Sequence, residues 1–316
     1  MTRIARREGN GEAELAHRVL VLIWITAGSL PTYYSDVIKM LDKGIQDGSE
    51  SLKASSVLAL AVISFIEDPG HATIWEIMES IEDVLLTDEI DPLVSKSALE
   101  AFGLLYTATA KKIGREDFNR IVDEHSALLE SNDVDVRIAA GENLAIMFED
   151  LDASQQSDDP QPGASLQNTK ALFCDAFDEL VRQLAFLAKE STKHRSKKDK
   201  AVQKSAFRDI LDTIESSISP TIRLKIKQEV IACDSWAKIR RLNVFRDAIG
   251  EGMHVHFEHN PVVQSIFQFS LQGSSDRTRP IGADRRLIQT AVEKARTKAI
   301  NDMRGSRNAF KSSSME

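Results

Sequence analysis

The sequence predicts an all-α protein built from helical hairpins, and three observations support this fold class. Apolar residues recur at three- and four-residue spacing in 34–41, 74–86, 118–129, 172–187 and 207–214. No convincing alternation of apolar and polar residues, the pattern of a β-strand, is evident. Breakers separate the apolar segments at helix boundaries, where proline's fixed φ and missing amide proton do least harm. They include Asp68-Pro69-Gly70, Asp91-Pro92 and Ser219-Pro220.

An internal repeat of 42 residues makes the predicted architecture more specific. Three segments that begin at Leu52, Val94 and Val136 align without a gap. Each follows a second amphipathic helix, so the period suits helical hairpins of the armadillo or HEAT kind, which run about 40 to 47 residues. Small residues inside the copies would let neighbouring helices pack closely into one continuous core. They are Ala54, Ser55, Ser97, Ala98, Ala139, Ala140 and Gly141. The alternative, chance alignment within a helical bundle, is disfavoured by the two equal offsets.

Composition divides the chain into five parts. With the repeat, this division predicts an armadillo/HEAT-like α-solenoid that carries a projecting basic C-terminal helix. Residues 1–150 hold the acidic repeats, and the polar, Pro/Gly/Ser-rich segment 151–169 predicts a flexible linker or loop. Residues 170–272 form a basic helical region that completes the solenoid. A second stretch rich in breakers, 273–283, predicts a hinge before the basic helix and tail of 284–316.

Composition also excludes several classes of protein. With 42% hydrophobic residues in 316, disorder along the whole length is excluded. Two cysteines exclude a disulfide framework and a Cys-rich zinc site, and they favour a reducing compartment. The apolar run 19–28 is shorter than the ~20 residues of a membrane-spanning helix, and acidic residues separate it from the basic start, unlike in a signal peptide. We expect a soluble, unsecreted protein that does not bind membranes.

Motifs for catalysis or metal binding are sparse. His254, His256 and His259 are spaced by two and three residues, which is not the helical HExxH arrangement of a zinc hydrolase. No Gly-rich phosphate loop, GxSxG elbow or kinase signature is present. Cys233 is interpreted as a small core residue, and Trp236 as a core residue rather than a platform for base stacking. We therefore predict a binding scaffold that is not an enzyme and needs no metal or cofactor.

Charge is distributed very unevenly along the chain. Residues 1–190 hold 16 Lys and Arg against 34 Asp and Glu, a net charge of −18, whereas residues 191–316 hold 24 against 14, a net charge of +10. Lys and Arg neutralise phosphates and release condensed counterions, so the second part predicts a polyanionic partner. The alternative is that charged faces only keep the helices in solution.

Two clusters hold most of the Lys and Arg of residues 191–316. In the first, KHRSKKDKAVQKSAFRD, Lys197, Lys200, Lys204 and Arg208 would form a basic ridge on one helix face. The same run resembles a nuclear-localisation signal. In the second, residues 284–311, a narrow apolar stripe of Leu, Ala and Met leaves too little apolar surface for a core helix. We expect a projecting basic helix suited to RNA, an anionic membrane or a calmodulin-like groove, with the membrane least favoured because aromatic anchors are absent.

Four stretches are long enough to compare with known families. They are NDVDVRIAAGENLAIMFE (132–149), LAKESTKHRSKKDKAVQKSAFRDIL (187–211), CDSWAKIRRLNVFRDAIGEGMHVHFEHN (233–260) and EKARTKAINDMR (293–304). On these stretches the sequence resembles the interferon-related developmental regulator family. Residues 1–131 match it mainly in helical character, and the polar segment 151–169 departs from its pattern.

The resemblance implies an armadillo-like solenoid without catalytic activity, in a family linked to two roles. One is translational silencing, in which some members bind the eukaryotic ribosome near its tRNA sites and place the basic C-terminal helix in the mRNA channel. The other is transcriptional co-regulation through deacetylase co-repressor complexes. The first role implies a cytoplasmic protein, and the second a nuclear one. A solenoid that caps its own ends is expected to be a monomer.

These implications define the candidate sites. Ribosomal RNA phosphates would be contacted by Lys193, His194, Arg195, Lys197, Lys198, Lys200, Lys204, Arg208, Lys238, Arg240 and Arg241. The channel would be filled by the helix that carries Arg285, Arg286, Lys294, Arg296, Lys298, Arg304 and Arg307. A co-repressor protein would instead use the concave face of the repeat helices before Asp150.

Overall fold

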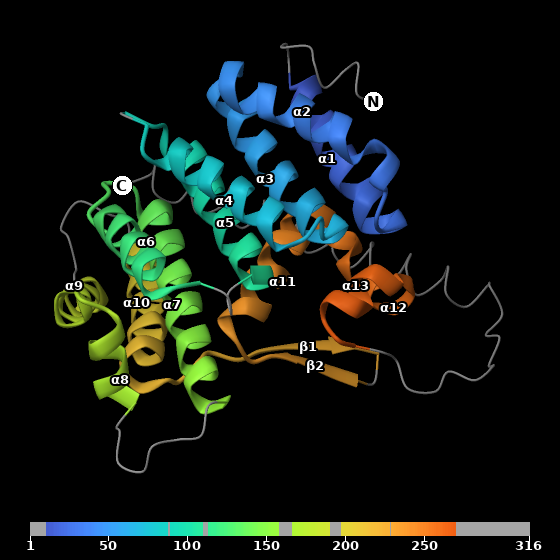
Figure 1. Cartoon of the computed structure of the whole chain (residues 1–316). Helices are drawn as coiled ribbons and strands as arrows, with labels where there is room; N and C mark the ends of the chain where they lie inside the picture. Colours follow the sequence, from blue (N-terminus) through green and yellow to red (C-terminus); the bar gives the residue numbers. More distant parts are fainter. Residues whose placement is uncertain are drawn as a thin grey trace, which may run out of the picture. The chain divides into compact units, whose positions relative to one another are not determined.

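The computed structural model describes residues 11–87, 89–109, 113–157, 166–189, 197–227 and 229–269 (Figure 1). The chain divides into two compact units, Met1–Ser270 and Leu271–Glu316. The second unit contains the predicted hinge 273–283 and basic helix 284–316, and it lies outside the described residues.

The described residues form α-helices, one short 3-10 helix and one pair of strands. The helices of the first part are α1 (Glu12–Ala27), α2 (Pro31–Asp47), α3 (Glu50–Glu67), α4 (His71–Leu85), α5 (Pro92–Thr109), α6 (Arg115–Leu128) and α7 (Val134–Ser157). They are followed by α8 (Leu166–Phe173), α9 (Phe177–Lys189), α10 (Lys197–Ser216), β1 (Ile222–Ile226), β2 (Glu229–Cys233), α11 (Trp236–Ile249), the 3-10 helix Gly250–Gly252, α12 (Met253–His259) and α13 (Pro261–Ile266).

The helices pack as a row of hairpins. Helices α3, α5, α7 and α10 contact one another in succession, and each is backed by the helix before it in the chain, α2, α4, α6 or α9 (Figure 1). Helices α3, α5 and α7 begin at Glu50, Pro92 and Val134, which are 42 residues apart. The predicted repeat and the all-α solenoid fold are thus confirmed.

The same period governs how the three repeat helices begin. The side-chain oxygens of Ser49, Asp91 and Asp133 accept hydrogen bonds from amides of the first helical turn, at 3.4 Å, 2.8 Å and 2.9 Å respectively. A Ser or Asp at this position satisfies amides that lack a partner inside the helix, which typically contributes about 1 kcal/mol. Each repeat therefore carries its own start signal, and the sequence repeats it every 42 residues.

Small residues bring the repeat helices close together, as predicted. Ser56, Ala98 and Ala140 are 42 residues apart and fully buried. At Gly141 an added Cβ would lie 2.9 Å from Cδ1 of Ile210 and 3.1 Å from Cε1 of Phe207, so a larger residue would force these side chains of α10 to shift. Such close packing lets adjacent hairpins share one hydrophobic core that extends through the described residues.

A β-hairpin follows α10, where the sequence analysis expected no strand. Strands β1 and β2 are antiparallel, with Arg223 opposite Ala232 and Lys225 opposite Val230. Lys227 adopts a φ of 55°, a left-handed conformation suited to a tight hairpin turn. The missed signal is the alternation of Ile222, Leu224 and Ile226 with basic residues, which is short but has the two-residue period of a strand.

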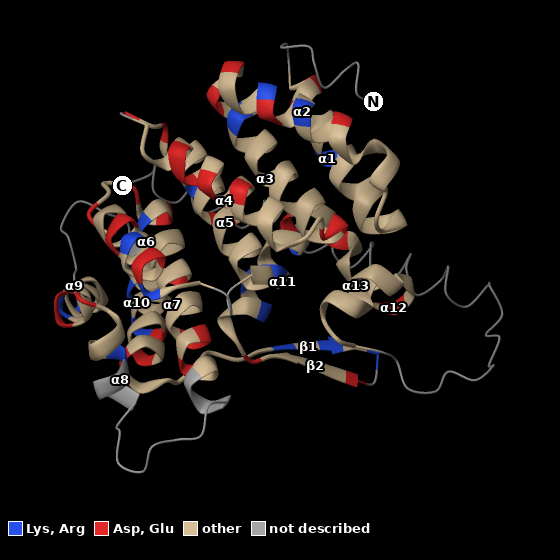
Figure 2. Cartoon of the chain, viewed as in Figure 1, with Lys and Arg blue, Asp and Glu red and all other residues tan. Residues whose placement is uncertain are grey.

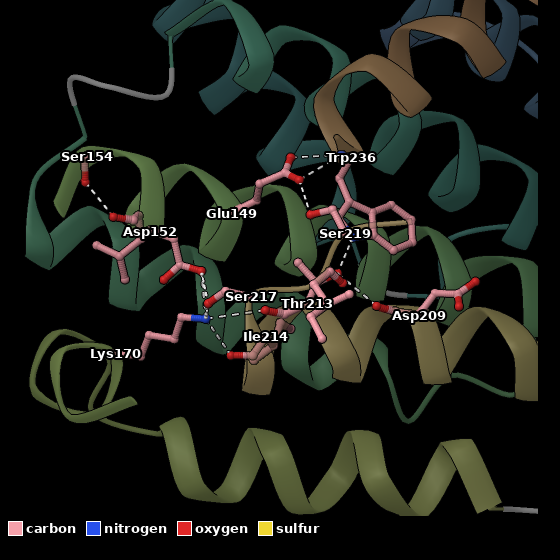
Figure 3. Close-up of polar contacts among 12 residues, drawn as sticks. Glu149, Asp152, Ser154, Lys170, Asp209, Thr213, Ile214, Ser217, Ser219 and Trp236 are labelled. Atoms are coloured by element: carbon pink, nitrogen blue, oxygen red, sulfur yellow. Dashed lines mark hydrogen bonds and ion pairs between the residues drawn. The ribbon is translucent and has the colours of Figure 1, made fainter. Parts of the chain in front are cut away.

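The predicted linker is shorter at both ends than 151–169. Helix α7 continues to Ser157 and α8 starts at Leu166, so only residues 158–165 lie outside the described residues here. The helix continues because Asp152 is buried and has a partner. Its Oδ2 lies 2.8 Å from Nζ of Lys170 and accepts a hydrogen bond of 2.8 Å from Oγ of Ser217 (Figure 3).

Lys170 is almost fully buried and holds the end of α10. Besides the ion pair, its Nζ donates hydrogen bonds to the carbonyl of Ile214 at 2.8 Å and to Oγ of Ser217 at 3.0 Å (Figure 3). The last carbonyls of a helix have no partner inside it, and they carry partial negative charge that a cation stabilises. Lys170 thus fixes the point where the chain leaves α10 toward the hairpin.

Glu149 lies on α7 one turn before Asp152, and it holds the start of α11 in place. Its Oε2 accepts a hydrogen bond of 2.9 Å from the amide of Trp236, and its Oε1 is bonded to Oγ of Ser219 (Figure 3). Burial raises the pKa of Glu149, and these donors oppose that shift by favouring the carboxylate. Helix α7 therefore anchors both ends of the segment that carries the hairpin.

Candidate nucleic-acid interface

The first basic cluster lies at the start of α10, and the structure describes only part of it. Lys193, His194 and Arg195 lie outside the described residues. Lys197, Lys198 and Lys200 fall within the helix, and their side chains are not described. Lys204 is half-buried and follows the buried Gln203. Arg208 is exposed and follows the buried Phe207.

The basic ridge ends at Arg208. The exposed positions that follow on α10 are the acidic Asp209, Asp212 and Glu215, and Ser216 at its end. Because phosphates are repelled by carboxylates, only the first half of α10 is suited to a nucleic acid. The acidic second half separates this basic site from those that come later in the chain.

Arg240, predicted to contact phosphate, is buried inside the protein. Only 3% of it is exposed, and its Nη2 donates to the carbonyl of Ala139 at 3.3 Å and to Oδ1 of Asn143 at 3.0 Å. The same nitrogen lies 3.1 Å from Oε2 of Glu142. A guanidinium enclosed by these acceptors cannot reach a polyanion, so we withdraw the phosphate contact expected of Arg240.

The Arg240 site belongs to a buried polar network between helices. Asn143 on α7 donates to the carbonyl of Leu99 on α5 at 2.8 Å, and its Nδ2 lies 3.2 Å from Nε2 of His125. Burial lowers the pKa of His125 to about 4, so the ring is neutral near pH 7 and accepts this hydrogen bond. At Gly103 an added Cβ would lie 2.1 Å from Oδ1 of Asn143, so glycine makes the room for the network.

Arg241 and Lys238 are also less free than the sequence indicated. Arg241 is half-buried. Its Nε and Nη2 donate to Oγ1 and the carbonyl of Thr107 at 3.0 Å and 2.8 Å, and its guanidinium carbon lies 5.2 Å from the ring centre of Phe65. Arg241 thus holds α11 against the end of α5. Lys238 is partly exposed, with its Nζ 2.7 Å from Oδ1 of Asp234. Of the three, Lys238 alone remains a candidate for phosphate contact.

The hairpin supplies a basic surface that the sequence analysis missed. Arg223, Lys225 and Lys227 are exposed, and Lys227 is paired with Glu258, its Nζ lying 2.9 Å from Oε2. Figure 2 shows Lys and Arg positions in blue on β1. Arg223 and Lys225 share one face of the hairpin with Ala232 and with Val230, which is 59% exposed. The only acidic residue of the two strands, Glu229, is on the opposite face together with Ile231 and Cys233. We call Arg223, Lys225 and Lys227 the hairpin basic face.

Residues outside these basic sites fit a structural interpretation. Trp236 is buried and its Nε1 donates to Oγ1 of Thr213 at 2.7 Å, so its predicted place in the core is confirmed (Figure 3). Cys174 and Cys233 are buried free thiols, as expected for core cysteines.

The histidine cluster does not converge on one point. His254 bonds to the carbonyl of Glu251 and His256 accepts from Asn260, while His259 lies 3.5 Å from Glu258. Within the described ranges, no group of three His, Cys, Asp or Glu side chains is arranged to hold a metal ion. None of the helices in those ranges has both the length and the apolar character that crossing a bilayer requires.

Comparison with known proteins assigns the family. The family model for interferon-related developmental regulators matches residues 1–215. The chain belongs to the interferon-related developmental regulator family. The match includes the N-terminal repeats, which the sequence analysis compared with the family only in helical character.

Individual members of this family resemble the chain along most of its length. It is 30% identical over 287 residues to interferon-related developmental regulator 1 of Sus scrofa, a match that covers 85% of this chain and 61% of the relative. The human protein of that name is 29% identical over 287 residues, with 85% and 60% covered. Interferon-related developmental regulator 2 of Mus musculus is 30% identical over 219 residues, with 67% and 46% covered. The chain thus spans about three fifths of the first two relatives.

Proposed function

We propose that this member of the interferon-related developmental regulator family binds the eukaryotic ribosome and represses translation by occupancy rather than by chemistry. The tRNA sites and the mRNA channel are the proposed docking region, with ribosomal RNA as the main polyanion. The proposal combines translational silencing, one of the two roles implied by the family resemblance, with the charge distribution of the chain. The observation that carries it is the hairpin basic face, because Arg223 and Lys225 are exposed there and form no ion pair with any described residue. Lys227 contributes less, since its Nζ lies 2.9 Å from Oε2 of Glu258.

Two described basic sites would contact RNA. The hairpin basic face is the first, and the described end of the α10 ridge, the half-buried Lys204 and the exposed Arg208, is the second. Phosphate contacts give affinity without reading sequence, so specificity would come from the shape of structured RNA. Both sites are fixed to one core, since Lys170 and Glu149 tie the end of α10 and the start of α11 to α7.

The C-terminal basic helix, residues 284–316, would fill the mRNA channel. It lies outside the described residues, and its role rests on its charge and on the family resemblance. If the helix acts as a plug, the first unit can be folded and still fail to repress.

Removal of residues 277–316 is expected to relieve inhibition in a cell-free translation assay. The first unit should stay folded, because the deletion removes only residues of the second unit. Far-ultraviolet circular dichroism of the truncated chain checks this point. A matched control that ends at Arg307 keeps the seven predicted arginines and lysines of the channel helix and should inhibit like the full chain. Full inhibition by the longer deletion would contradict the channel-plug mechanism.

The deletion also separates the two candidate functions. For a transcriptional co-regulator, loss of the basic helix need not change translation at all. A co-repressor is expected to bind the repeat helices before Asp150. Helix α11 packs against two of these helices, α5 and α7, and contacts α1. That part of the repeat face is occupied by the chain itself, which disfavours it as the co-repressor site.

A further inference from the structure

A large groove between α2 and α4 is unrelated to the basic sites. It has a volume of about 860 Å³. Helix α2 contributes Ile38 and Ile45 to its lining and α4 contributes Ile77 and Val84, with Leu60 of α3 between them. The two apolar residues of each helix are seven residues apart, so they lie on the same side of that helix, with the polar lining residues Asp42 and Ser80 between them.

The rim of this groove is strongly acidic. Six carboxylates line it against two lysines, Lys39 and Lys53, and Lys53 is already paired with a rim carboxylate, its Nζ lying 3.2 Å from Oε1 of Glu50. The carboxylates are those of Asp42, Glu50, Glu76, Asp83, Glu89 and Asp91. Figure 2 shows acidic residues along α4. An anionic occupant such as RNA would be repelled here.

Asp42 gives an independent sign that positive charge is lacking at one point of the groove. Its side chain is half-buried, and no described residue donates a hydrogen bond or an ion pair to its carboxylate. Burial raises its pKa, as expected for a carboxylate without a compensating charge. A cationic group placed in the groove would remove this cost.

We propose that the groove between α2 and α4 binds a Lys- and Arg-rich amphipathic helix of a partner protein. An amphipathic helix in a groove buries its apolar face on the floor and leaves its flanks at the rim. The apolar lining residues of α2, α3 and α4 match such a face, and the six carboxylates of the lining match basic flanks. The site is on the acidic half of the chain, so the proposal is independent of ribosome binding.

The test uses two helical model peptides of about 18 residues, each with Leu at three-four spacing. One carries Lys at all other positions and the second carries Glu. Binding to the full chain is followed by fluorescence anisotropy. The groove variant is the double substitution Glu76→Lys and Asp83→Lys, both at exposed positions of α4. The matched control, Asp36→Lys and Asp212→Lys, makes the same charge change at exposed positions outside the groove.

We expect the Leu/Lys peptide to bind the wild-type chain and the control equally, and the groove variant roughly tenfold more weakly, as two attractive surface pairs become repulsive. The Leu/Glu peptide should not bind. Equal loss in both variants would show diffuse charge attraction and overturn the site, as would no binding of the Leu/Lys peptide. A dimer in sedimentation equilibrium that the groove variant disperses would overturn the choice of occupant in favour of a second copy.

Discussion

Replacement of Arg240 by Met is expected to lower the free energy of unfolding by about 3 kcal/mol. Met fills much of the same volume without the charge, so the carboxylate of Glu142 and Oδ1 of Asn143 lose their partner inside the protein. Breaking a buried ion pair costs about 3–5 kcal/mol, and the lower value applies because the side chain of Glu142 keeps 19% exposure. Urea unfolding followed by circular dichroism measures the change.

The control for this variant is Arg246→Met, on the same helix. Arg246 is exposed, so the substitution should change the free energy of unfolding by about 0.5 kcal/mol or less. If the two variants lose equal stability, Arg240 is not the buried tie between α11 and α7 that the contacts indicate. Ribosome binding by a folded Arg240→Met chain should equal that of wild type, since the guanidinium is out of reach of RNA.

The second large effect is expected at Lys170, whose replacement by Met should cost about 3–5 kcal/mol. The pair with Asp152 is more enclosed than the Arg240 pair, with side-chain exposures of 1% and 9%. Loss of Nζ also leaves the carbonyl of Ile214 without its donor. Thermal unfolding should show a large fall in Tm for this variant.

A double-mutant cycle separates the ion pair from the packing of Lys170. Asp152→Asn alone removes the negative charge and leaves the lysine buried and unpaired, so it should also be destabilising. Because the two groups interact directly, the double variant should lose less stability than the two single losses added together. Additive losses would mean that Lys170 and Asp152 contribute independently.

The repeat was predictable because its causes are local. Start signals at Ser49, Asp91 and Asp133 and small core residues recur within each 42-residue unit, so a single copy already carries the pattern. The linker boundary was wrong because its cause is distant. Asp152 is polar in sequence and becomes a core residue only when Lys170 and Ser217 meet it.

The basic residues show the same difference between local and distant causes. Arg240 and Arg241 are adjacent in a basic sequence, and nothing local distinguishes a buried arginine from a surface one. The partners of Arg240, Glu142 and Asn143, lie about a hundred residues earlier. The hairpin basic face had a local signal, the alternation of Ile222 to Lys227, which was missed because the strand is only five residues long.

Sedimentation of the chain with eukaryotic ribosomes on a sucrose gradient tests whether the chain binds the ribosome. The chain should move with the ribosome at low salt and be released as salt rises. By analogy with duplex DNA, ~6–10 phosphate contacts lose ~10³–10⁵ in affinity between ~50 and ~200 mM salt.

The variant Arg223→Glu with Lys225→Glu should be released at lower salt than wild type. The control, Lys43→Glu with Arg182→Glu, makes the same charge change at exposed positions of the acidic half and should behave like wild type. A wild-type chain that stays at the top of the gradient at low salt would contradict the account.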